Sequence, residues 1–151
     1  MKTKIIFLTL NLICLTSCVP TSNDSTLIKT SSIFNSEVNH EYTEISKYRI
    51  TWDEIFNIEM KDYFVYFFQR TCSHCQNLKN RIIEEALKRE NIFFYEDSGE
   101  TKFTSDVSYT IGLTSVDSFA IQGFPSLIEI LDGKIVKNVA GEKEISRILF
   151  V

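Results

Sequence analysis

The chain has 151 residues, of which 44% are hydrophobic and 13% are aromatic, with 16 basic and 20 acidic side chains. This length suits one domain, and the hydrophobic fraction excludes a wholly disordered chain. The formal net charge of −4 argues against a nucleic-acid-binding protein, because such a protein needs a basic face.

The first 17 residues have the layout of a secretory signal peptide. Lysines precede an apolar run at residues 5–15, which is too short to span a bilayer as a helix. The run leads into Leu15-Thr16-Ser17-Cys18, which resembles the lipobox of bacterial lipoproteins. This resemblance implies cleavage before Cys18 and lipidation of its sulfur. A plain secretory signal with a chance cysteine is the open alternative.

A flexible tether is expected at residues 18–38, which are rich in Ser, Thr and Asn, ahead of a folded domain at residues 39–151. Without the signal peptide the chain stays acidic, so its own surface would not hold it on anionic lipid. The acyl chains on Cys18 would therefore attach it to a membrane, facing outside the cytoplasm.

The folded region begins with weak signals and continues with a strong one. Residues 42–50 indicate a weak strand or coil. Residues 51–54 have the pattern of a capping box, which predicts a short helix to about Glu59. Residues 63–68 are an unbroken aromatic and β-branched run, which is typical of a strand covered on both faces.

A helical pattern follows at residues 73–90, and residues 92–95 predict a second buried strand. Residues 97–113 are polar and predict no defined element. The apolar side chains expected to share one face of the helix are Leu78, Ile82, Ala86 and Leu87.

The end of the chain predicts a hairpin between two helices. Residues 115–120 can form a short helix, and residues 142–150 a closing helix. Residues 126–131 and 134–140 alternate like strands around Asp132-Gly133, a strong turn signal. A strand-helix-strand unit implies a parallel pair with a right-handed crossover, and the hairpin adds antiparallel strands. The sequence therefore predicts an α/β fold, a mixed sheet with helices on both faces.

The chain has four cysteines. Cys14 lies within the signal peptide and Cys18 would carry lipid, which leaves Cys72 and Cys75 free to react. A disulfide between residues so close in sequence closes almost no loop, so this pair is not expected to serve stability.

Cys72 is expected at the junction of the aromatic strand and the following helix. A thiolate there would be stabilised by the unpaired N–H groups and the positive dipole of the helix start. Arg70 and a protonated His74 would stabilise it further. Cys75 lies about one turn later on the same side, so it can close a disulfide with Cys72, and it should be the less exposed sulfur.

At these residues the chain resembles the thioredoxin superfamily. The strand, the Cys72-Ser73-His74-Cys75 motif and the helix match that family, and so does the later Gly123-Phe124-Pro125-Ser126-Leu127 loop. The resemblance covers residues 60–151 and implies a thioredoxin-like fold. It also implies a redox-active Cys72–Cys75 disulfide without metal or other cofactor, and a cis-proline loop in which Phe124 and Pro125 contact substrate.

Two residues depart from the family pattern. Family reductases carry a buried acid at the position of Tyr66, and a phenol with a pKa of about 10 is a poor base at neutral pH. Thr71 stands where Trp is common. The Ser-His pair between the cysteines resembles isomerases and oxidants of the family, which favours a more oxidising disulfide than that of thioredoxin.

The sequence thus predicts a membrane-tethered extracytoplasmic thiol–disulfide oxidoreductase. Its partners would be extracytoplasmic proteins with thiols or disulfides and a redox protein that recharges the site, and not nucleic acid. The alternative is a non-catalytic thioredoxin-fold accessory lipoprotein of a secretion or bacteriocin-export system. A structural zinc site would need two further ligands, and the only histidines are His40 and His74.

Overall fold

The computed structural model describes residues 38–150. The predicted signal peptide, the lipidation site Cys18 and nearly all of the predicted tether lie outside these residues. Within the described part, no helix has both the length and the apolar character needed to cross a membrane. Its elements, in chain order, are the 3-10 helices η1 (Ser46–Tyr48) and η2 (Trp52–Glu54), β1 (Asp62–Phe68), α1 (Ser73–Arg89), β2 (Ile92–Glu96), the 3-10 helix η3 (Ser108–Thr110), β3 (Ser126–Leu131), β4 (Lys134–Ala140) and α2 (Glu142–Leu149).

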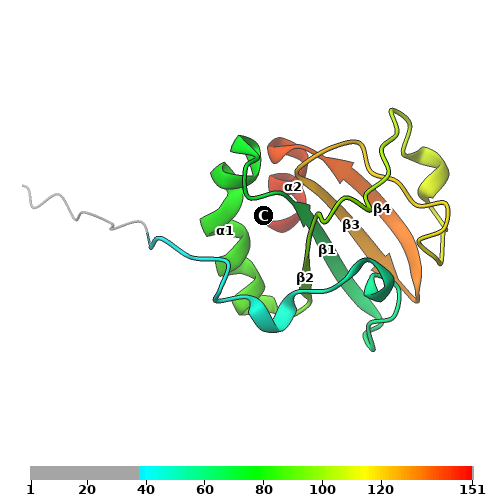
Figure 1. Ribbon diagram of the computed structural model, residues 1–151. Helices are drawn as coiled ribbons and strands as arrows, with labels where there is room; N and C mark the ends of the chain where they lie inside the picture. The colour runs from blue at the N-terminus through cyan, green and yellow to red at the C-terminus, as the bar shows by residue number, and fades with distance from the viewer. Residues whose placement is uncertain (1–37, 151) are drawn as a thin grey trace, which may run out of the picture. The chain divides into compact units, whose positions relative to one another are not determined.

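The strands form one mixed four-stranded sheet in the order β2-β1-β3-β4 (Figure 1). β1 pairs in parallel with β2 and antiparallel with β3, and β3 pairs antiparallel with β4. The predicted α/β class and mixed sheet are confirmed. The predicted bounds of the hairpin strands β3 and β4 are also correct. Asp132 and Gly133, which join them, both adopt the positive φ that a tight two-residue hairpin turn requires.

β1 lies inside the sheet and is buried on both faces from Tyr63 to Phe68. Successive side chains of a strand point to opposite faces, so the aromatic run contributes to two separate cores. Tyr66 and Phe68 belong to the core beneath the two α-helices, here called the helix-side core. Tyr63 and Phe67 belong to the opposite one, here called the loop-side core.

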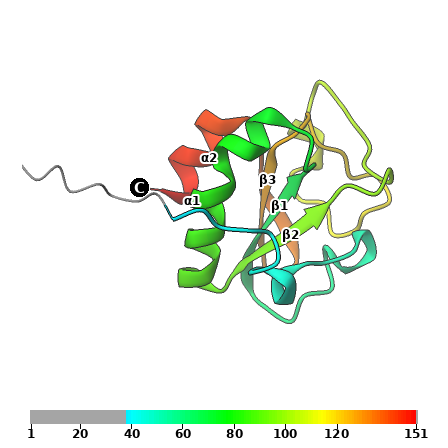
Figure 2. The same ribbon diagram turned by 60° about the vertical axis from the view of Figure 1, so that its left-hand side comes forward.

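Both α-helices cover the same face of the sheet and pack on each other (Figure 2). The sequence pattern predicted Leu87 on the buried face of α1, but this side chain is 39% exposed and lies at the solvent edge. Ile83, which the pattern did not single out, is buried instead. The buried residues of α1 are Cys75, Leu78, Ile82, Ile83 and Ala86.

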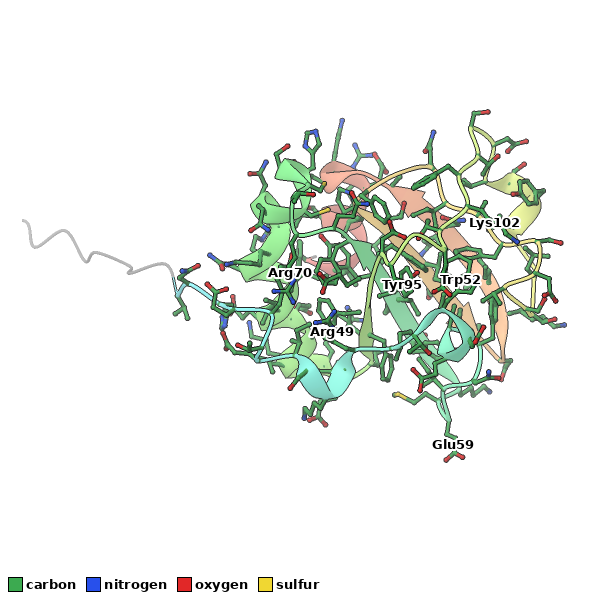
Figure 3. All side chains as sticks on the ribbon, in the orientation of Figure 1. Arg49, Trp52, Glu59, Arg70, Tyr95 and Lys102 are labelled. Atoms are coloured by element: carbon green, nitrogen blue, oxygen red, sulfur yellow. The ribbon has the colours of Figure 1, made fainter. Side chains whose placement is uncertain are left out.

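The loop-side core is covered by η2 and by the segment between β2 and β3. Trp52 of η2 packs on Tyr95 with 5.4 Å between ring centroids (Figure 3), and on Phe119 at 5.6 Å. Phe119 also packs on Phe67 of β1 at 5.5 Å. Helical residues therefore lie on both faces, as predicted, but this face has short 3-10 helices in place of an α-helix.

Two predicted helices differ from the structure. The capping box at Thr51 and Glu54 is present, but the helix that it opens is only the short 3-10 helix η2 and ends well before Glu59. Residues 115–120 form turns, so the predicted helix there is wrong. The Ser115 hydroxyl bonds both the backbone N–H and the carboxylate of Asp117, and such local side-chain bonds compete with helix formation.

Irregular chain lies along both edges of the sheet. At β2, the N–H of Ile50 donates to the carbonyl of Phe94 at 3.0 Å. At β4, Ile135 accepts a hydrogen bond from the N–H of Gly112 at 2.7 Å and donates one to the carbonyl of Leu113 at 3.0 Å. The weakly patterned residues 42–50 and the unassigned stretch at residues 97–113 thus supply edge coverage.

Candidate functional site

Cys72 is the N-cap residue of α1, directly after the loop that leaves β1. Its sulfur accepts a hydrogen bond from the backbone N–H of Cys75 at 3.3 Å. The N–H of Cys72 donates to the carbonyl of Gln69 at 3.2 Å, which fixes the loop. The sulfur thus takes the place of the oxygen of an ordinary helix cap, at the positive end of the helix dipole.

Cys75 lies inside α1 and has no exposed surface, whereas Cys72 is partly exposed. The prediction that Cys75 is the less exposed sulfur is confirmed. Burial raises the pKa of the Cys75 thiol to about 12, and the neighbouring Cys72 sulfur contributes to the increase. Both cysteines are free thiols in this structure, and at neutral pH Cys75 is protonated.

The loop before β3 lies against the Cys72 sulfur. The Cys72 thiol donates to the carbonyl oxygen of Phe124 at 3.7 Å, and the peptide bond between Phe124 and Pro125 is cis, as predicted. Two hydrogen bonds hold the loop. The Ser126 hydroxyl donates to the carbonyl of Gly123 at 2.6 Å, and the N–H of Gly141 donates to the carbonyl of Pro125 at 2.8 Å. The structure therefore brings the predicted substrate loop and the predicted reactive sulfur together.

Phe103 extends this surface, and the sequence analysis did not single it out. Its ring is 58% exposed and packs edge-to-face on the Phe124 ring with 5.5 Å between centroids. A parallel bridge to Ile121 holds it beside the loop. Phe103 lies in the polar stretch without an assigned element, and its position beside Phe124 depends on contacts that no local sequence pattern reveals.

His74 points toward the start of α2. Its Nδ1 lies 2.6 Å from a carboxylate oxygen of Glu142, and the side-chain amide of Asn77 donates to the same oxygen at 3.0 Å. The bond to His74 is the main cause that holds the pKa of Glu142 below its usual range. A protonated His74 would therefore be paired with a carboxylate, and its effect on Cys72 stays a prediction.

Arg70 also has a carboxylate partner. Its guanidinium donates two hydrogen bonds to Glu96, from Nε at 2.7 Å and from Nη2 at 3.2 Å, and Arg49 donates to the same carboxylate. Figure 3 shows Arg49 and Arg70 next to each other at this point. The bond from Arg70 is the main cause that lowers the pKa of Glu96. Whether Arg70 tunes the Cys72 thiol stays a prediction.

Tyr66, at the position of the family's acid, is fully buried in the same core as Cys75. Burial raises the pKa of its phenol well above the usual range, and the Cys75 sulfur adds to this effect. The Tyr66 hydroxyl has no hydrogen-bond partner within residues 38–150. The same is true of the hydroxyl of Tyr42, whose ring stacks on Phe68 at 4.4 Å.

Neither histidine lies with both cysteines in a metal-binding cluster. His40 bonds the Glu44 carboxylate at 2.9 Å, as His74 bonds Glu142. Across residues 38–150, no group of three or more His, Cys, Asp or Glu side chains is arranged to hold a metal ion.

Comparison with known proteins adds a family match. The family model for thioredoxin matches residues 41–150. The chain is similar in structure to thioredoxin f from spinach chloroplast, with 14% identity and a TM-score of 0.46 over 66% of this chain and 78% of that one. It is also similar to mitochondrial thioredoxin 3 from Saccharomyces cerevisiae, with 12% identity and a TM-score of 0.45 over 68% of this chain and 92% of that one. Thioredoxin NaTrxh from Nicotiana alata has 23% identity and a TM-score of 0.45 over 66% of this chain and 87% of that one. A comparison with curated proteins found no match.

Proposed function

The chain belongs to the thioredoxin family, and from this premise we propose that it exchanges disulfides with substrate proteins through Cys72 and Cys75. The observation that carries the proposal is the contrast between the two sulfurs. Cys72 is partly exposed at a helix start and faces the Phe124 carbonyl, whereas Cys75 is buried one turn away. An accessible attacking thiol and a sheltered second thiol are what a two-step exchange requires.

In the first step, the Cys72 thiolate attacks one sulfur of a substrate disulfide. A bond forms between Cys72 and that sulfur, and the other substrate sulfur leaves as a thiolate that takes a proton from water. In the second step Cys75 loses its proton to water and attacks the Cys72 sulfur. The Cys72–Cys75 disulfide forms, and the remaining substrate sulfur leaves as a thiolate that takes a proton from water. The substrate disulfide is then reduced and the protein oxidised, and the reverse sequence oxidises a substrate dithiol.

An extended substrate segment would lie along the Phe124–Pro125 loop. Strand addition would pair the substrate backbone with this loop, and the exposed ring of Phe103 together with the partly buried ring of Phe124 supplies an apolar surface next to Cys72. This arrangement favours substrates that carry apolar side chains beside the cysteine.

The exchange is proposed to occur outside the cytoplasm, with the domain tethered by lipid on Cys18. The support is the order of charge, apolar run and cysteine in the first 18 residues. Cys18→Ala should release the protein from the membrane fraction or block its processing. Unchanged membrane association and electrophoretic migration of this variant would contradict the anchor.

The exchange itself is tested by trapping. Cys75→Ser removes the second thiol, so mixed disulfides with substrates should accumulate on Cys72, while Cys72→Ser should trap few. Non-reducing electrophoresis followed by mass spectrometry detects them, and Cys14→Ser with Cys18→Ser in every variant excludes the other two cysteines. Absence of trapping by either variant would refute the exchange and favour the non-catalytic accessory lipoprotein.

A further inference from the structure

The core that contains Cys75 also contains buried hydroxyls without a hydrogen-bond partner. Within residues 38–150 four buried side-chain oxygens have no hydrogen-bond partner, and two of them, the hydroxyls of Tyr42 and Tyr66, lie in the helix-side core with Cys75. A buried hydroxyl without a partner lowers stability, so such a group calls for an explanation.

The Tyr66 ring is fixed where it is. It stacks on Phe68 with 6.0 Å between ring centroids and meets Phe94 edge-to-face at 5.8 Å. The residue has no exposed surface, so its hydroxyl cannot turn to solvent. The hydroxyl must find its partner inside the helix-side core, to which the Cys75 sulfur also belongs.

The two groups influence each other in opposite directions. The Cys75 sulfur adds to the burial that raises the pKa of Tyr66, whereas the Tyr66 hydroxyl lowers the pKa of Cys75 against the larger effect of its burial. These signs are those of a phenol that keeps its proton and donates it in a hydrogen bond to a thiolate.

We propose that the Tyr66 hydroxyl donates a hydrogen bond to the Cys75 sulfur once that sulfur is a thiolate, and thereby promotes the step in which Cys75 displaces the substrate. This inference rests on the proposed function. A neutral thiol is a weak acceptor and a thiolate a much stronger one, so the bond gains strength when Cys75 loses its proton. Tyr66 does not act as the base: the proton of Cys75 leaves to water, and Tyr66 keeps its own.

The expected effect follows from the strength of a hydrogen bond to a charged group. Its loss should reduce the thiolate fraction of Cys75 by about 10- to 100-fold at neutral pH. A thiolate of higher pKa is a better nucleophile, which recovers about half of this loss on a logarithmic scale. The displacement step of Tyr66→Phe should therefore be about 3- to 10-fold slower.

The experiment uses the full chain with Cys14→Ser and Cys18→Ser, so that only Cys72 and Cys75 react. Reduced protein is mixed with dithiobis(nitrobenzoate), which releases one coloured thiolate when Cys72 attacks and another when Cys75 displaces it. Stopped-flow absorbance separates the two phases across about pH 5 to 9. Tyr63→Phe is the matched control, because Tyr63 lies on the same strand but on the opposite face.

In Tyr66→Phe the second phase should be slower and its pH profile should shift to higher pH, while the first phase stays unchanged. In Tyr63→Phe both phases should match those of the parent chain. A second phase of Tyr66→Phe that matches the parent chain at every pH overturns the inference while the proposed function stands. A parent chain that shows no second phase overturns the proposed function and the inference with it. The substitution removes only an unpaired hydroxyl, and a thermal unfolding curve verifies that the variant is folded.

Discussion

The two faces of the sheet treat the same kind of side chain differently. On the loop side, Tyr63 donates its hydroxyl hydrogen to the carbonyl of Ile55 at 2.9 Å. On the helix side, the hydroxyls of Tyr42 and Tyr66 have no partner within residues 38–150. The face with unpaired hydroxyls is the face that contains Cys75. Tyrosine hydroxyls without a partner are thus found in the core that contains Cys75, whereas the corresponding tyrosine of the opposite face is paired.

The two faces of the sheet also differ in the contacts that attach the covering segments to the strands. Two α-helices cover one face through packed apolar side chains. The irregular cover of the other face is held by buried rings such as Trp52 and Phe119 and, in addition, by individual polar bonds. The Asn138 side-chain amide donates to the Thr110 hydroxyl and to the Ala120 carbonyl, each at 3.0 Å, and joins the cover to β4.

The largest effect is expected from removing a ring that holds the irregular cover. Phe119→Ala should lower the free energy of unfolding by about 3 to 5 kcal/mol, because the ring is fully buried against Trp52, Phe56 and Phe67. Denaturant unfolding measures the loss. Phe103→Ala is the control and should change stability by less than about 0.5 kcal/mol, since that ring is mostly exposed. A loss below about 1 kcal/mol in Phe119→Ala would mean that the cover contributes little to the fold.

A smaller effect is expected at the polar link. Asn138→Ala should cost about 2 kcal/mol, because it leaves the Ala120 carbonyl without its amide partner, and it should speed amide hydrogen exchange at Gly112. The neighbouring Lys137→Ala breaks only a partly exposed ion pair with Glu129 and should cost less than about 1 kcal/mol. Equal losses in the two variants would show that the cover does not depend on this link.

The tyrosines of β1 test the comparison directly. Tyr63→Phe should cost about 1 to 2 kcal/mol because the Ile55 carbonyl loses its donor. Tyr66→Phe removes a hydroxyl without a partner and should change stability by less than about 0.5 kcal/mol. Thermal or denaturant unfolding compares the two. A larger loss of unfolding free energy in Tyr66→Phe than in Tyr63→Phe would mean that the hydroxyl of Tyr66, and not that of Tyr63, makes the stabilising hydrogen bond.

The smallest effect concerns the acidic group at the edge of the helix side. Arg70 and Arg49 hold the pKa of Glu96 below its ordinary value of 4.5, so their stabilisation is present above pH 4.5 and is lost as the pH falls through the lowered value. Glu96→Gln should cost less than about 1 kcal/mol at neutral pH, and the difference from the parent should vanish in acid. The control is Glu59→Gln (Figure 3), since Glu59 makes no ion pair within the described part of the chain. A difference that persists at low pH would exclude this charge effect.

Local patterns in the sequence predicted the regular elements well. The aromatic run predicted β1, and the Asp132-Gly133 turn fixed both strands of the hairpin. The short helix predicted at residues 115–120 failed because side-chain bonds of Ser115 and Asp117 stabilise turns there.

At the candidate site, the sequence indicated the two cysteines and their relative exposure but not the surroundings of the charged residues. Arg70 and Glu96 are 26 residues apart, and His74 and Glu142 are 68 apart. Such pairs are set by the packing of distant elements, and no local pattern reports them. Tyr66 was recognised as a departure from the family pattern, but its unpaired hydroxyl follows only from how the core packs around it.

The coverage of the sheet edges has a consequence for how this molecule meets other chains. Exposed edges of a sheet can recruit strands from neighbouring molecules and lead to aggregation. Here Ile50 occupies the carbonyl of Phe94 on one edge, and Gly112 and Leu113 occupy both backbone groups of Ile135 on the other. At these positions a second copy of the chain finds no free partner for continuing the sheet. The irregular segments therefore occupy, on both edges, backbone groups that a neighbouring strand would need in order to extend the sheet.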